Sequence, residues 1–131
     1  MGQTTEEGIT NVLETYFATP GDFFVGLCSD TSIAKDATYA GLTEVSGSGY
    51  ALIALSTIIA STYSVDDVQV NGNEVTFNAT GTWTVANAWF VIKEISSGTY
   101  VLVCWNVLTA GATTLINGQS IAITPALIGV G

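Results

Sequence analysis

The last 37 residues of this chain, 95–131, contain no charged side chain, and ten of its eleven acidic residues come before Val75. An edge strand usually carries charges that oppose pairing with other chains. The run Tyr100–Trp105 is instead apolar on both faces of a strand. We expect it to be a central strand with both faces covered, or to be buried against another subunit. The uncharged tract 95–131 therefore predicts a homo-oligomer whose interface draws on it.

The charge balance excludes several classes of function. The 131 residues include eleven Asp and Glu, two Lys, no Arg and no His, for a formal net charge of −9. With Lys35 and Lys93 as its only cationic side chains, the chain lacks the positive surface needed to bind nucleic acid or anionic lipid headgroups. Without His it has no Ser–His or Cys–His pair and no imidazole metal ligand. We predict no nucleic-acid partner.

A second uncharged stretch covers residues 45–65. Its apolar part, 51–60, is much shorter than the roughly 20 residues that a membrane-spanning helix needs, and no Lys or Arg flanks it. We therefore predict no membrane partner. The first residues lack the basic and apolar regions of a signal peptide, so we expect a protein made in a reducing cytoplasm.

One helix is predicted near the N-terminus, over about residues 5–18. Apolar residues recur there at helical spacing, and Pro20 ends the pattern because the residue before proline avoids the helical region. Thr4 and Glu7 have the spacing of a capping box. The apolar stripe consists of Ile9, Val12, Leu13, Tyr16 and Phe17.

Strands are predicted from residue 22 onward. Asn71-Gly72-Asn73 and Ser96-Ser97-Gly98 each separate two apolar runs and predict hairpins. The expected strands cover residues 22–28, 50–59, 65–70, 74–77, 88–95, 99–108 and 119–128. The fold class is therefore mainly β: an antiparallel β-sandwich of about seven to eight strands with one N-terminal amphipathic helix, in a single domain over 1–131.

The polar segment 29–48 is predicted to be a long loop, and loops of this length are often functional. Tyr39 and Leu42 are its exposed apolar candidates for contact with a partner. Together with three residues of the uncharged tract they form the predicted interface set, which is Tyr39, Leu42, Tyr100, Leu102 and Trp105.

The sequence offers little material for catalysis or ligand binding. Asp66, Asp67, Asn71, Asn73 and Glu74 gather oxygen ligands, but their spacing does not match a calcium loop. Cys28 and Cys104 are expected to be buried thiols, and a disulfide between them stays open as an alternative. The three tryptophans are core or interface residues or, alternatively, stack on sugars. We predict no catalytic residue, no cofactor and no metal.

Several segments resemble a family of small virion proteins of tailed bacteriophages, which are described as head-decoration, minor structural or tail-fibre proteins. These segments are 23–28 (FFVGLC), 44–51 (EVSGSGYA), 83–90 (WTVANAWF) and 117–123 (NGQSIAI). The chain has Leu52 where the family usually has Arg, and Asn87 where it often has His. The resemblance implies a β-sandwich that assembles on the virion and has no catalytic activity.

The function expected from these features is that of a non-enzymatic capsid decoration (cement) protein that stabilises the shell as a homo-oligomer. Its expected partners are copies of itself, for which the resemblance suggests a trimer, and phage structural proteins such as the major capsid protein. Two alternatives stay open: a tail or neck adaptor or fibre component, and a carbohydrate-binding module that uses exposed Trp.

Overall fold

A computed structural model describes residues 5–63 and 68–129, which form one α-helix and nine strands. The helical segments are α1 (Glu6–Tyr16) and the 3-10 turns η1 (Pro20–Asp22) and η2 (Tyr39–Gly41). The strands are β1 (Phe23–Cys28), β2 (Ile53–Ala54), β3 (Ile58–Tyr63), β4 (Val68–Gly72), β5 (Val75–Asn78), β6 (Ala88–Ser96), β7 (Thr99–Val107), β8 (Ser120–Ile123) and β9 (Ala126–Gly129).

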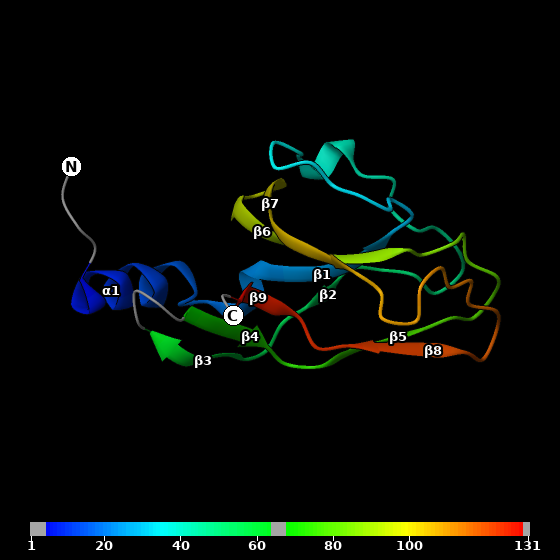
Figure 1. Ribbon diagram of the computed structural model, residues 1–131. Coiled ribbons are helices and arrows are strands. Elements are labelled where there is room, and N and C mark those ends of the chain that lie inside the picture. The colour runs from blue at the N-terminus through cyan, green and yellow to red at the C-terminus, as the bar shows by residue number, and fades with distance from the viewer. Residues whose placement is uncertain (1–4, 64–67, 130–131) are drawn as a thin grey trace.

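The strands form two layers, with α1 at one end (Figure 1). One layer is the antiparallel sheet β2-β1-β6-β7, which we call the upper sheet. The other layer, which we call the lower layer, contains the sheet β3-β4-β9 and the pair β5-β8. Along the chain, β5 follows β4 and β8 leads into β9. The mainly β, antiparallel fold with an N-terminal helix is thus confirmed.

The main core lies between the two layers. Alternate residues of β1 point into it, namely Phe23, Val25 and Leu27, and all three are fully buried. Val70, Val75 and Phe77 face them from the lower layer, while Leu13 and Phe17 of α1 join the same cluster. The period of two along β1 therefore gives the upper sheet one face for this core and a second face that needs other cover.

Helix α1 confirms the predicted position with shorter bounds. Its N-cap is Thr5, whose side chain accepts a hydrogen bond from the Gly8 backbone N–H at 3.1 Å. Thr4 of the predicted capping box lies outside the described residues. Leu13 and Phe17 are buried as the stripe predicts, but Val12 is 63 % exposed. The helix projects beyond the end of the sheets, so only part of its stripe has a surface to pack against (Figure 1).

The predicted hairpin at residues 71–73 is wrong. β4 pairs with β3 and β9, whereas β5 pairs with β8, so the chain passes from one sheet to another at this point. The Asn73 side-chain oxygen accepts hydrogen bonds from the backbone N–H groups of Ser56 and Thr57, at 2.8 and 3.0 Å. These tertiary bonds fix the segment as a crossover, although Asn-Gly favours a tight turn locally.

Two other predicted strands are each divided in the structure. The expected strand 50–59 becomes β2 and the start of β3, because the chain leaves the upper sheet for the lower layer after Ala54. The expected strand 119–128 becomes β8 and β9, separated by Thr124 and Pro125. Proline has no N–H for a ladder, so a break at Pro125 is physically reasonable. These divisions account for nine strands instead of seven or eight.

The hairpin β6–β7 is confirmed, and its turn contains Gly98 at a φ of 75°. β7 is nevertheless the last strand of the upper sheet, so of the two alternatives expected for Tyr100–Trp105 the central strand is wrong, and burial against another subunit stays a prediction. Its side chains are half-buried on both faces. Val103 and Cys104 pack on the main core, and the other face is covered by the segment described next.

Candidate docking surface

A second hydrophobic cluster lies on the outer face of the upper sheet. Ala88, Phe90 and Ile92 of β6 point into it, and all three are fully buried. Gly26 on β1 leaves room for Phe90, since a Cβ atom at Gly26 would overlap the Phe90 ring and lie 2.8 Å from Leu52 Cδ2. The sheet is therefore apolar on both faces, and its outer face requires a cover.

The segment 29–48, which we call the strap, supplies that cover (Figure 1, cyan). It is a long loop, as predicted, with η2 at its centre. Ile33, Ala37, Tyr39 and Leu42 lie against the outer cluster. The expectation that Tyr39 and Leu42 are exposed is wrong, because both are half-buried on the apolar outer face.

The strap is held at both ends by hydrogen bonds. Near its start, the Ser29 N–H donates to the Thr43 carbonyl at 2.9 Å, and the Thr43 N–H donates to the Asp30 carboxylate at 2.8 Å. The Asn87 side-chain amide donates to the Ser29 carbonyl at 2.7 Å. At the far end, the Val45 N–H donates to Leu27 O of β1 at 2.9 Å. The strap is therefore an ordered part of the fold.

Glu44 joins the strap to the sheet through two tyrosines. Tyr39 OH donates to Glu44 Oε1 at 2.7 Å, and Tyr50 OH donates to Glu44 Oε2 at 2.6 Å. Tyr50 OH also accepts a hydrogen bond from the Leu27 N–H at 3.0 Å. Burial, followed by the hydrogen bonds to Glu44, raises the pKa of both phenols above the ordinary value. We call this group of three side chains the clasp.

The five residues of the predicted interface set lie together in this region. Tyr100, Leu102 and Trp105 reach it from β7, where they occupy the outer face of the sheet. Tyr39 and Tyr100 pack edge to face, with ring centroids 5.8 Å apart. All five side chains are half-buried, so each contacts its own chain and keeps some surface exposed. The loop and the uncharged tract, predicted as separate contact regions, thus form one surface.

The two cysteines are free thiols on opposite faces of the upper sheet. Cys28 is buried in the outer cluster, and Cys104 packs against the main core. The alternative of a disulfide is therefore wrong. Burial raises the pKa of Cys28 to about 11 and that of Cys104 to about 12. At neutral pH both are protonated, so neither has the character of an activated nucleophile.

Two of the three tryptophans are buried and the third is half-buried. Trp83 is 3 % exposed and its indole N–H donates to the Ser48 carbonyl at 2.6 Å, Trp89 is 9 % exposed, and Trp105 is half-buried in the outer cluster. The carbohydrate-binding alternative, which needs an accessible Trp, would therefore rest on Trp105, because the other two are buried and residues 5–63 and 68–129 include all three.

Within the same described ranges, no group of three or more Cys, Asp or Glu side chains is arranged to hold a metal ion. Asp66 and Asp67 of the considered calcium cluster lie outside these ranges. No helix in the described part of the chain has the length and apolar character needed to cross a membrane.

Sequence reasoning missed the clasp and the packing role of Gly26. Glu44 and Tyr50 flank Ser46-Gly47-Ser48-Gly49, which marks a turn but does not say what the side chains on either side of it contact. Their contact depends on how the strap returns to β1.

Comparisons of the chain with protein-family models, curated proteins and solved structures find no match.

Proposed function

We propose that this protein is a non-enzymatic structural protein of a tailed bacteriophage particle, and specifically a capsid decoration protein that acts as a homo-oligomer. The observation that carries the proposal is the docking surface itself. Five half-buried apolar side chains from the strap and from the uncharged strand β7 meet on one face of the upper sheet. Aromatic residues of this kind are typical of interface centres, where a partner completes their burial.

The polar groups nearest this surface support a structural role. Both oxygens of the Glu44 carboxylate accept hydrogen bonds from phenols. The Asp30 carboxylate accepts the Thr43 N–H, which fixes the strap. These acids thus contribute to the conformation of the strap. The mechanism proposed for the decoration protein is mass action: a partner that binds the assembled shell better than its separate parts stabilises the shell.

The proposal places copies of the protein on the major capsid protein through the strap. The exposed side chains of the strap are small or polar and include Lys35, Asp36 and Ala40. A partner that covers it gains contact with the half-buried rings beside it. A tail or neck adaptor would need a surface of the same kind, so the particle location is an outcome of the test below.

The test compares two exposed alanines, Ala40 on η2 and Ala18 after α1. Particles are assembled with wild-type protein, Ala40→Asp or Ala18→Asp, and the bound protein is quantified and located by electron microscopy. We expect Ala40→Asp to lower occupancy at least tenfold and Ala18→Asp to bind as wild type, with density on the capsid. Equal binding of both variants would exclude the strap as the docking element, and density confined to the tail or neck would replace the capsid role with the adaptor role.

A further inference from the structure

The outermost strands of the two larger sheets come from the two uncharged stretches of the sequence. Residues 45–65 include β2 and β3, and residues 95–131 include β7, β8 and β9. β2 and β7 are the two outermost strands of the upper sheet, and β3 and β9 are the outermost strands of the three-stranded sheet below it. The strands at each lateral edge of the sandwich thus carry no charged side chain within the described residues.

The strands of each edge lie on the same side of the molecule. At one edge β7 lies over β9, where Cys104 Sγ is 3.7 Å from the Ala126 carbonyl oxygen. At the other, the chain passes from β2 to β3 through the three residues 55–57. We call these two surfaces the β7–β9 edge and the β2–β3 edge. In the upper sheet, the strands between them, β1 and β6, are flanked by or contain Asp22, Lys93 and Glu94.

This arrangement favours a second copy of the chain as the occupant of each edge. Two copies with a net charge of −9 each repel one another, because carboxylates brought face to face cannot be neutralised by two lysines. Lys93 is already engaged, since its Nζ donates to the Tyr16 carbonyl at 2.8 Å and lies 4.0 Å from the centre of the Tyr16 ring. Contact between uncharged edges avoids that repulsion, whereas a basic partner would be drawn to the acidic helix and strap.

We infer that copies associate head to tail, with the β7–β9 edge of one copy packed against the β2–β3 edge of the next. This inference rests on the proposed self-association and specifies its geometry. A contact between two different surfaces is heterologous, so it forms a closed ring when the rotation between copies closes, and a filament when it does not. A ring of three is consistent with the trimer that the family resemblance suggests.

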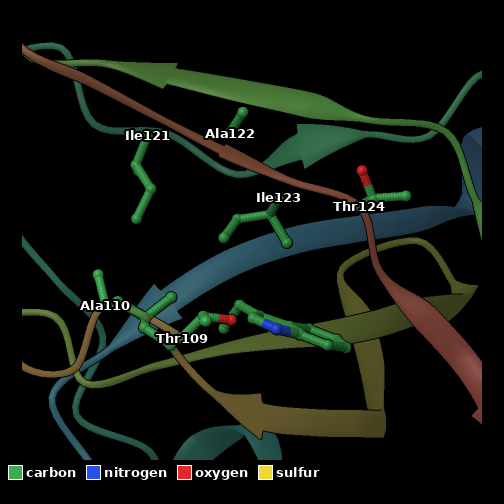
Figure 2. A pocket seen from close by; sticks show the side chains of 8 residues that line it. Thr109, Ala110, Ile121, Ala122, Ile123 and Thr124 are labelled. Carbon is green, nitrogen blue, oxygen red and sulfur yellow. The ribbon is translucent and has the colours of Figure 1, made fainter.

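Each edge has a feature that such a contact would bury. At the β7–β9 edge, a cavity of about 250 Å³ lies between β8 and the turn after β7. Its lining combines Trp89, Leu108, Ile121 and Ile123 with Thr109, Ala110, Ala122 and Thr124. Figure 2 shows Ile121 and Ile123 pointing from β8 toward this turn. Val107 beside the turn is 50 % exposed. The β2–β3 edge presents Ile59, which is 62 % exposed.

The test places one acid on each edge and then mixes the variants. Val107→Asp and Ile59→Asp change exposed side chains, so both chains should fold, which circular dichroism checks. Val12→Asp on α1 is the matched control, because Val12 is 63 % exposed and belongs to neither edge. Sedimentation velocity at micromolar concentration is measured for wild type, each variant and an equimolar mixture of the two edge variants.

We expect wild type and Val12→Asp to sediment as the same oligomer and each edge variant to sediment as a monomer. The mixture should form a two-chain complex, because one intact edge of each kind remains in it. An oligomer that survives Ile59→Asp, or a mixture that stays monomeric, would overturn the head-to-tail geometry while leaving self-association in place. A monomeric wild type would overturn both this inference and the proposed self-association.

Discussion

Replacing Glu44 by glutamine tests whether the clasp holds the strap on the upper sheet. In the wild type each carboxylate oxygen accepts one phenol, from Tyr39 at 2.7 Å and from Tyr50 at 2.6 Å. Glutamine keeps the shape of the side chain but has one carbonyl oxygen and one amide group. Both phenols then lose their charged acceptor, and one of them faces an amide donor.

The size of the effect follows from the change in bond type. A hydrogen bond to a charged group contributes about 1.5–3 kcal/mol and a neutral one about 0.5–1.5 kcal/mol, so two bonds lose about 2 kcal/mol together. The three side chains are half-buried, and solvent weakens the loss. We therefore expect Glu44→Gln to lower the free energy of unfolding by about 1–2 kcal/mol. For a domain of this size, that corresponds to a fall in Tm of roughly 4–8 °C.

Thermal and urea unfolding measure the global effect, and hydrogen exchange measures the local one. The backbone N–H groups of Ser29, Thr43 and Val45 should exchange faster in Glu44→Gln, since their bonds fix the two ends of the strap. The control is Glu14→Gln on the exposed side of α1, which should change stability by less than about 0.5 kcal/mol. A Glu44→Gln variant with the Tm and exchange rates of that control would refute the role of the clasp.

Three further predictions concern the tyrosines, the upper sheet and the helix. Burial, together with the neighbouring carboxylate, raises the pKa of Tyr50 above 10.0 in the folded state, so the contribution of this phenol to stability is complete below about pH 10 and is lost as pH rises through the folded pKa. Urea unfolding between about pH 8 and 12 should show the free energy of unfolding falling with pH, and Tyr50→Phe should make that fall less steep. An equally steep fall in both proteins would contradict the linkage. Gly26→Ala should lower the free energy of unfolding by about 1–3 kcal/mol, because the added Cβ overlaps the Phe90 ring. The control is Gly21→Ala, which has open space around its Cβ. Equal stability of the two variants would show that the Phe90 ring moves without cost. Lys93→Met removes the hydrogen bond to the Tyr16 carbonyl at the end of α1 and the contact with the Tyr16 ring. It should destabilise the protein by about 1 kcal/mol and speed hydrogen exchange in α1. Unchanged exchange in α1 would argue against this anchoring.

The sequence predicted those elements whose structure is determined locally. Ser96-Ser97-Gly98 forms the expected hairpin because Gly98 supplies the positive φ and the strands on each side pair with one another. Asn71-Gly72-Asn73 has an equally strong local signal and forms no hairpin. Its outcome is decided by partners distant in sequence, since Ser56 and Thr57 bond the Asn73 side chain. Turn chemistry alone does not say which strands will pair.

The candidate surface was predictable as a set of residues but not as an arrangement. Tyr100, Leu102 and Trp105 share a face of β7, and their apolar character already indicated contact with something. That the contact includes the chain's own strap could not be deduced, because a loop of about 20 residues has no periodicity that specifies where it packs. The exposure expected for Tyr39 and Leu42 was wrong for that reason.

Strand β6 lies between the main core and the outer cluster, with side chains in both. A change in its number of residues is therefore more disruptive than a change in the identity of one residue. Ala88, Phe90 and Ile92 face the outer cluster, while Trp89 and Val91 face the main core. Insertion or deletion of one residue would reverse the two sets, placing large rings in the space shaped for small side chains and leaving voids opposite. A substitution within β6 perturbs one interior, whereas a frame change perturbs both at once. Related chains should therefore vary in length within their loops and keep the spacing of this strand unchanged.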